Sequence, residues 1–250
     1  RRPRPRFRNP TITHPTETTT MNFRRTLLSA AAAATVATLV HLPAAAQQVI
    51  KLTATAGHPP VFLWVKTMDE VFIPEVDKRL AAAGNKYKIE WTKAWGGTLI
   101  KLGSESKGVA DGIADIGLVS TIFEAAKFPL QNVTYYTPFG SDDVAVISKT
   151  ISELQTKIPA MADAWNKNGL TYLNGMALDS YHVWTKFPIT KIEDLQGKKL
   201  SAPGPAANWV KGTGAIAVAG TLNSYYEDIK SGVSDGAVVF ATGAAAAKLH

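Results

Sequence analysis

The sequence predicts an α/β fold built as two lobes that close around a small ligand. Residues 112–120 (GIADIGLVS) and residues 232–240 (GVSDGAVVF) read almost as copies of one another. In each, a glycine can take the left-handed conformation that ends a helix, and an aspartate then opens a short apolar run suited to a buried parallel strand. Because these two joints lie about 120 positions apart, they favour one such unit in each lobe. Two ordinary helix-to-strand turns are the alternative.

The first 46 residues carry the features of a secretory leader. Residues 1–20 are basic and rich in proline, with no periodicity. Two arginines then follow Met21, an apolar run spans residues 27–42, and three alanines end at Ala46. This order is typical of a signal peptide, and the apolar run is short for a membrane span of about 20 residues. We therefore expect cleavage after Ala46 and a periplasmic mature chain.

The basic character of the whole chain resides in this leader. The chain carries 27 Lys and Arg and 20 Asp and Glu, but residues 1–46 hold seven arginines and one acid, Glu17. The rest therefore has 20 basic residues (27 minus 7) and 19 acidic ones (20 minus 1), among which Arg79 is the one arginine. A net charge near zero gives no support to a nucleic-acid partner.

The remaining composition requires an ordinary hydrophobic core. The sequence has no cysteine, which excludes disulfides, thiolate metal sites and a cysteine nucleophile. The 204 residues after position 46 are enough for one large or two small domains. The run 244–250 begins like a helix and stops without a cap, so we expect a C-terminal part beyond it. We divide the chain into leader 1–46, first lobe 47–179 and incomplete second lobe 180–250.

Strands and helices alternate along both lobes. Polar and apolar residues alternate in a first strand, a helix with a bend at Pro74 follows, and each later element is bounded by glycine or proline. The first lobe is predicted to contain strand 49–56, helix 61–83, strand 87–92, helix 99–110 and strand 115–120. A helix over 144–167 and a crossing strand over 170–177 and 181–185 are predicted next. The second lobe is predicted to contain a short helical turn at 192–197, strand 199–202, helices 208–217 and 225–231, and the second joint. Ligands of parallel sheets bind beyond the carboxyl ends of the strands.

Two motifs resemble a known family. Residues 192–200 (IEDLQGKKL) and residues 226–236 (YEDIKSGVSDG) are similar to motifs of the extracytoplasmic solute-binding proteins of tripartite ATP-independent periplasmic (TRAP) transporters. The resemblance covers the whole chain after residue 46 in order. It implies a two-lobed periplasmic binding protein clamshell (type II-like) with a cleft between the lobes. It also implies capture of an organic acid and delivery to membrane subunits of a TRAP transporter.

The sequence departs from the family at its ligand-clamping positions. Where the family usually has an arginine after the first motif, this chain has Ser201, and His182 takes the place of a second frequent arginine. An asparagine usual just past the second Asp-Gly is replaced by Val239 and Phe240. A carboxylate could instead be held by His182, by Ser201 with backbone N–H groups, or by Lys101 or Lys186.

Aromatic residues gather near the predicted strand ends, which favours a bulky or aromatic carboxylate over a small dicarboxylate. The alternative is that most of these rings belong to the core. The residues expected to contact the ligand are His58, Trp95, Ser120, Thr121, Tyr136, His182, Trp184, Ser201, Asn208, Trp209 and Phe240.

No catalytic residue, metal site or cofactor is expected. The chain contains neither G-x-S-x-G nor H-E-x-x-H, and the run 212–217 (GTGAIA) lacks the preceding strand of a dinucleotide-binding fingerprint. We therefore expect a binding protein rather than an enzyme. An exported α/β enzyme acting on a small acid, or a ligand-presenting sensor module, are the alternatives.

Overall fold

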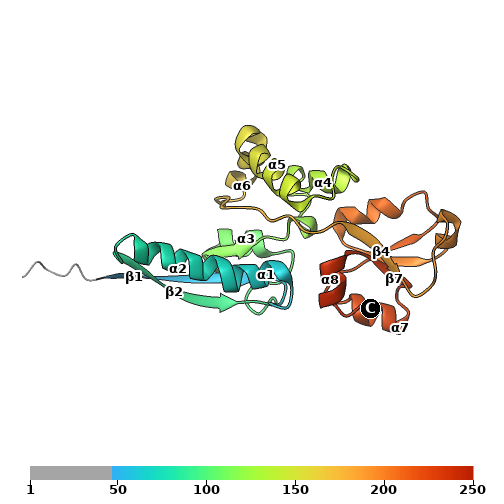
Figure 1. The fold of residues 1–250 in the computed structure, drawn as a ribbon, viewed down its shortest axis with the longest axis horizontal. Coiled ribbons are helices and arrows are strands. Elements are labelled where there is room, and N and C mark those ends of the chain that lie inside the picture. Colours follow the sequence, from blue (N-terminus) through green and yellow to red (C-terminus); the bar gives the residue numbers. More distant parts are fainter. Residues whose placement is uncertain (1–46, 250) are drawn as a thin grey trace, which may run out of the picture. The chain divides into compact units, whose positions relative to one another are not determined.

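A computed structural model describes residues 47–249 (Figure 1). The predicted signal peptide, residues 1–46, lies outside the described residues. The first sheet contains β1 (Gln48–Ala56), β2 (Tyr87–Ala94) and β3 (Ile116–Leu118) in the order β2-β1-β3, with both pairs parallel. The predicted strands and the parallel sheet are confirmed, although β3 is shorter than expected.

The long helix between β1 and β2 is present but contains a widened turn. It consists of α1 (Leu63–Thr67), a π-helical turn (Met68–Phe72) and α2 (Ile73–Ala82). Pro74 has no N–H to donate and its ring crowds the preceding turn, so the wide turn before it accommodates the proline without ending the helix.

The helix predicted over 99–110 is wrong in its first half. Only α3 (Glu105–Ala110) is helical, and the residues before it form turns. Gly103 in these turns has a φ of +80°, a left-handed conformation that interrupts a right-handed helix.

The segment between the sheets is mostly helical. It contains α4 (Val133–Tyr136), α5 (Val144–Lys157) and α6 (Pro159–Lys167). The single helix predicted over 144–167 is two helices, because Ile158 precedes a proline and adopts extended backbone at φ −108° and ψ 103°. The strand predicted over 170–177 is also wrong, since no strand of the described chain pairs with that segment.

The second sheet has the order β4-β7-β5-β6. It is formed by β4 (Tyr181–Thr185), β5 (Lys199–Ala202), β6 (Ile216–Ala219) and β7 (Gly236–Phe240), with β4 antiparallel to β7 and the other pairs parallel. All five residues of β7 are buried, as expected for a strand covered on both faces.

One predicted helix of this region is absent. A 3-10 helix (Gly204–Val210) and β6 replace the helix predicted over 208–217. Gly212 and Gly214 both have a φ of +81°, which turns the chain before β6. The predicted helix over 225–231 is confirmed as α7 (Tyr225–Ser231), and α8 (Ala241–Ala246) follows β7.

The two predicted helix-to-strand joints are confirmed. Gly112 and Gly232 follow α3 and α7 with φ of +75° and +80°, and β3 and β7 begin a few residues later. The first sheet packs on a core of Ala54, Met68 and Ile73. The second packs on two clusters centred on Leu200 and Tyr225.

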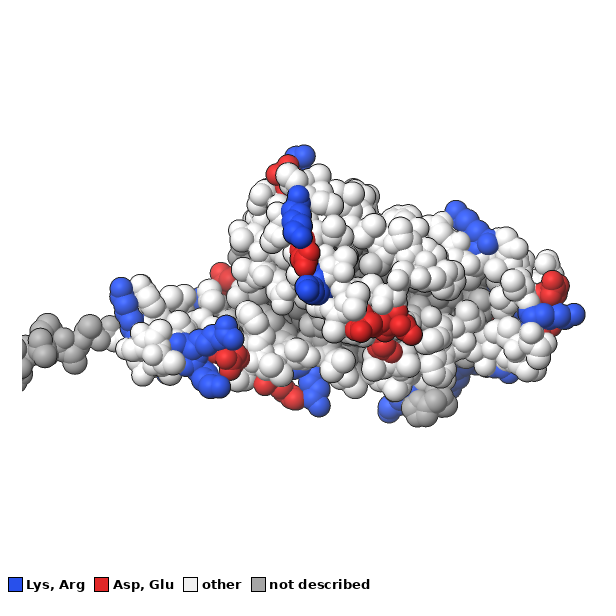
Figure 2. Space-filling model, turned by 45° about the horizontal axis from the view of Figure 1, so that its top comes forward, with Lys and Arg blue, Asp and Glu red and all other residues white. Residues whose placement is uncertain are grey.

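Figure 2 shows the charged side chains in small groups, one of them an acidic group near the centre of the view. Blue and red groups of both signs are separated there by larger uncharged areas. None of the helices within 47–249 is long and apolar enough to cross a membrane.

Candidate functional site

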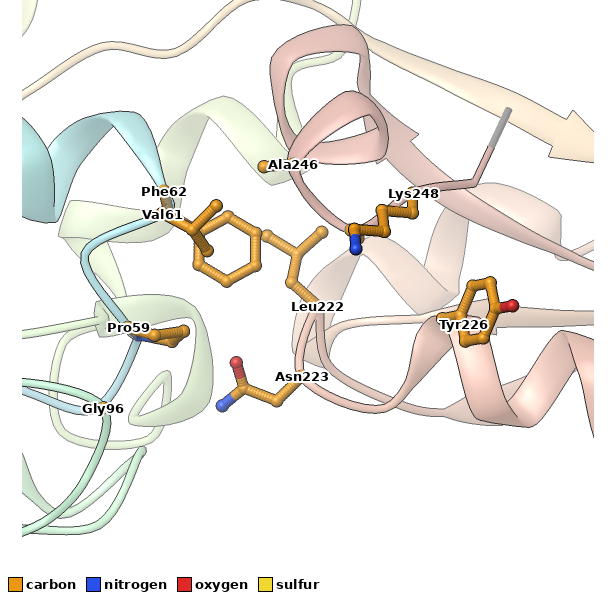
Figure 3. A pocket seen from close by; sticks show the side chains of 10 residues that line it. Pro59, Val61, Phe62, Gly96, Leu222, Asn223, Tyr226, Ala246 and Lys248 are labelled. Carbon is orange, nitrogen blue, oxygen red and sulfur yellow. The ribbon is translucent and has the colours of Figure 1, made fainter.

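Two adjoining cavities lie beyond the carboxyl ends of β1 and β2. The larger has a volume of about 580 Å³. Figure 3 shows Pro59, Phe62 and Gly96 on one side of it, and Leu222, Asn223, Tyr226 and Lys248 on the other, with the Asn223 amide directed toward the Pro59 side. The walls therefore come from segments far apart in the sequence.

The smaller cavity has a volume of about 410 Å³ and shares two lining residues with the larger, Gly96 and Asn223. Its other lining residues are Gly57, Gly97, Lys101, Leu102, Phe123 and Thr221. Each cavity is within the size range of small-molecule sites.

Among the described residues, lysines are the only charged side chains that line these two cavities. Lys101 lines the smaller cavity and Lys248 the larger, and no aspartate or glutamate joins them. A site with this charge balance attracts an anion. Lys186, the other lysine expected to hold a carboxylate, instead donates to the Ile229 carbonyl at 2.8 Å.

A continuous chain of rings adjoins both cavities. We call it the ring cluster, and its members in order are Phe123, His58, Phe62, Trp64, Phe240, Tyr181, Tyr135 and Trp209. Neighbouring rings in this order have centroids 5.0–6.1 Å apart. Phe62 lines the larger cavity and Phe123 the smaller. Phe62 and Phe240 are only 3% and 2% exposed, so most of the ring cluster belongs to the core, and Phe62 and Phe123 are its members at the cavity walls.

Hydrogen bonds fix the far end of the ring cluster. The Trp209 indole N–H donates to the Tyr135 carbonyl at 2.7 Å, and the hydroxyl groups of Tyr135 and Tyr181 are 3.3 Å apart. Burial raises the pKa of both phenols, so both remain neutral donors at physiological pH.

His58 lies at the junction of the two cavities. Its sequence neighbours Gly57 and Pro59 line the smaller and the larger cavity respectively. The imidazole is 4% exposed, and burial lowers its pKa to about 4, so it is neutral near pH 7. Its Nδ1 atom has no hydrogen-bond partner within the described chain.

Two buried carboxylate side chains, those of Glu105 and Glu124, lie behind the loop that follows β1. Glu105 is fully buried and its Oε2 accepts the Gly103 N–H at 2.7 Å, while Oε1 has no partner among the described residues. Glu124 is 5% exposed and is fully engaged: it accepts from the Ser106 N–H at 3.1 Å and from the Ser106 hydroxyl, and it pairs with Lys127 Nζ at 2.8 Å.

The other first-lobe residues expected at the site lie near it. Trp95 precedes Gly96, but its ring packs beside the core of the first sheet and its indole N–H is buried without a partner in the described region. Ser120 and Thr121 are half-buried after β3, and the Thr121 carbonyl accepts from the Asn132 amide at 2.9 Å.

The residues expected from the second lobe are dispersed. His182 and Asn208 are exposed, whereas Ser201 is fully buried in β5 with no partner for its hydroxyl in the described residues. The Trp184 indole N–H donates to the Val239 carbonyl at 3.0 Å. Tyr136 is 57% exposed and outside the ring cluster.

The structure thus brings His58, Trp209 and Phe240 together in the ring cluster, but none of the eleven expected residues lines either cavity directly. Phe62, Trp64 and Phe123 were missed. Phe62 and Trp64 follow His58 closely, at the start of a helix beyond a strand's carboxyl end, and that position is the signal that could have found them.

Comparison with known proteins identifies the fold. Residues 81–250 match the DctP family model, described as bacterial extracellular solute-binding protein, family 7. A TRAP periplasmic solute-binding protein from Desulfovibrio salexigens is 26% identical, with a TM-score of 0.61 over 76% of this chain and 56% of that one. One from Bordetella bronchiseptica, with bound (R)- and (S)-mandelate, is 25% identical, with a TM-score of 0.64 over 80% and 61%.

A marine metagenome TRAP solute-binding protein, specific for aromatic acid ligands and in complex with 3-hydroxybenzoate, shares the fold at 22% identity. Its TM-score is 0.68 over 81% of this chain and 61% of that one. This chain therefore spans between 56% and 61% of the length of the three solved structures.

Proposed function

Because this chain belongs to the bacterial extracellular solute-binding protein family 7, we propose that it captures an organic acid in the periplasm and delivers it to the membrane subunits of a TRAP transporter. The resemblance drawn from residues 192–200 and 226–236 is confirmed by this membership, and the two-sheet α/β clamshell is the fold of the family's solved structures. We also propose that the boundary between the two lobes lies after residue 179.

The observation that carries this proposal is the chemistry of the adjoining cavities. Within the part of the chain that the structure describes, their only charged lining side chains are Lys101 and Lys248, and their remaining walls are apolar or neutral. Lys101 supplies the positive charge for the ligand carboxylate, and Asn223, which lines both cavities, supplies a donor from the opposite wall.

The ring cluster supports a bulky or aromatic acid. Phe62 and Phe123 form aromatic parts of the cavity walls, and the neutral imidazole of His58 packs edge-on against Phe62 behind that wall. The mandelate-binding protein of Bordetella bronchiseptica, at 25% identity, favours the same ligand class. Trp209 and Phe240 pack farther along the ring cluster, and a role in ligand binding for any of the residues expected from the sequence stays a prediction.

Binding is proposed to favour a closed state. The lining residues come from the loops after β1, β2 and β3 and from segments near residues 221–226 and 246–248. A ligand that contacts both sets stabilises the arrangement in which both are close, and this is the physical basis of closure.

A thermal-shift screen tests the function. The chain from residue 47 onward is heated with mandelate, 3-hydroxybenzoate, succinate or acetate, since a ligand that binds only the native state raises the unfolding midpoint. We expect stabilisation by the aromatic acids, with the acid recovered unchanged afterwards. Conversion of the acid would indicate an enzyme. Stabilisation by succinate alone would contradict the aromatic ligand class.

A further inference from the structure

The carboxyl group of Glu105 lies directly behind the wall of the smaller cavity. Gly57 and Leu102 both line that cavity. A Cβ atom built on Gly57 would lie 2.5 Å from the Leu102 Cα and would also meet the Glu105 Oε1 atom. The side chain of Glu105 therefore packs against the side of Gly57 that faces away from the cavity. The backbone of Gly57 lies between the Glu105 carboxyl group and the cavity.

This carboxyl group is poorly compensated when ionised. It is fully buried and holds one strong donor, the Gly103 N–H at 2.7 Å. Burial raises its pKa to about 7, the charge of Glu124 adds to the rise, and nearby backbone N–H groups oppose it. Near neutral pH, the protonated and ionised forms of Glu105 are thus both populated.

The other titratable side chains around Glu105 are those of Glu124, Lys127, His58 and Lys101. Glu124 and Lys127 face it from the segment after β3 and form an ion pair with each other at 2.8 Å. His58, from the loop after β1, stays neutral because burial holds its pKa at about 4. Lys101 lines the same cavity from the turn before α3. Glu105 is therefore the group of this set that changes charge around pH 7.

We propose that Glu105 takes up a proton when an anionic ligand occupies the smaller cavity, so that ligand affinity is coupled to pH. This inference rests on the proposed function. An ionised Glu105 repels a carboxylate on the other side of Gly57 through the low-dielectric protein interior, and a protonated Glu105 does not. By linkage, the anion and the proton each favour binding of the other.

The sign of the effect follows from this coupling. Below pH 7, Glu105 is already protonated and affinity is independent of pH. Above pH 7, binding of the anion requires proton uptake, so affinity falls as pH rises, by up to about tenfold per pH unit until the pKa of the liganded state is reached. Release of the acid is then favoured at the more alkaline side of neutrality.

Isothermal titration calorimetry with mandelate tests this inference. Titrations between pH 6 and 8.5, in two buffers that differ in ionisation enthalpy, give both the affinity and the number of protons taken up. The variants are Glu105→Gln, which is permanently neutral and of similar size, and Glu90→Gln as the control at an exposed position on β2. Glu124→Gln serves as a second probe, since removing its charge lowers the pKa of Glu105.

The expected result is that the wild-type protein and Glu90→Gln take up a fraction of a proton approaching one at about pH 8. Glu105→Gln binds with no uptake and with an affinity independent of pH, and Glu124→Gln shifts the pH midpoint downward. If Glu105→Gln does not fold, the number of protons that the wild-type protein takes up on binding mandelate still tests the inference.

Mandelate binding without proton uptake in the wild-type protein would overturn this inference and leave the proposed function standing. The same uptake in Glu105→Gln would overturn it too. Absence of binding by mandelate and by 3-hydroxybenzoate at every pH would contradict both the inference and the proposed function.

Discussion

Asp235 pairs with Lys199 through two backbone-directed hydrogen bonds. The Asp235 carboxylate accepts the Lys199 N–H at 2.9 Å, and the Asp235 N–H donates to the Lys199 carbonyl at 2.7 Å. Asp115 and Thr53 form the same pair in the first sheet, at 2.7 and 2.9 Å. Asp115 thus links the start of β3 to the middle of β1, and Asp235 links the start of β7 to the start of β5.

Asp235→Ala is expected to lower the free energy of unfolding by about 1–2 kcal/mol, because it removes a charge-assisted bond to a backbone N–H. Asp235→Asn retains an acceptor and should lose less. Urea denaturation measures the effect, with Asp163→Ala on the exposed side of α6 as the control. Equal stability of Asp235→Ala and Asp163→Ala would show that the pair adds nothing.

Tyr181→Phe is expected to destabilise the fold by about 1–2 kcal/mol, because it leaves the buried hydroxyl of Tyr135 without its partner at 3.3 Å. Tyr136→Phe is the matched control, since that ring is 57% exposed, and its effect should stay within about 0.5 kcal/mol. Both values come from the same denaturant series. A loss as large in Tyr136→Phe as in Tyr181→Phe would contradict the role of the buried pair.

Gly57→Ala should both destabilise the protein and weaken acid binding. The added methyl group would meet the Glu105 carboxyl and the Leu102 backbone, and such overpacking costs about 1–3 kcal/mol. Gly140→Ala is the control, because its Cβ would be 3.7 Å from its nearest neighbour, the Thr137 carbonyl. Thermal unfolding with and without mandelate compares the two. Wild-type behaviour of Gly57→Ala would contradict the close contact.

The stability of the protein should respond to Glu105 in a defined pH window. Its folded pKa of about 7 exceeds the ordinary value of about 4.3, so the folded state holds a proton that the unfolded state releases between these values. Because of Glu105, the free energy of unfolding should therefore fall by on the order of 3 kcal/mol as the pH rises from about 4.5 to 7.

Glu105→Gln should remove that loss and be more stable than the wild-type protein at pH 8. The lowered pKa of His58 makes the free energy of unfolding fall as the pH drops from 6.5 to about 4, which is the opposite direction. Both proteins contain His58, so they are compared with each other at each pH. Urea denaturation at pH 5 and pH 8 provides the comparison. A stability difference that does not grow toward pH 8 would show that Glu105 is not held protonated.

The alternation of strands and helices could be predicted because each element carries its own local signal. Gly232 and Asp235, for example, fix the end of α7 and the start of β7 through backbone conformation and one hydrogen-bonded pair. The elements that were missed depend on distant partners. Residues 170–177 have the pattern of a strand but no neighbouring strand among residues 47–249, and residues 216–219 form β6 because β5 lies beside them.

The site was harder to predict for the same reason. His58 was singled out by its place after a strand, but the burial that keeps it neutral comes from Phe62, Trp64 and Phe123, which the sequence does not group together. Lys101 was one of several possible carboxylate ligands, and only the folded chain places it in a cavity.

The most direct test of the account is the affinity of mandelate for Lys101→Met, measured by calorimetry at pH 6.5 against the wild-type protein and against Lys149→Met, an exposed lysine on α5. If Lys101 holds the ligand carboxylate, Lys101→Met should bind at least about tenfold more weakly, since a hydrogen bond to a charged group is lost, and Lys149→Met should bind normally. Unchanged affinity in Lys101→Met would contradict the proposed site.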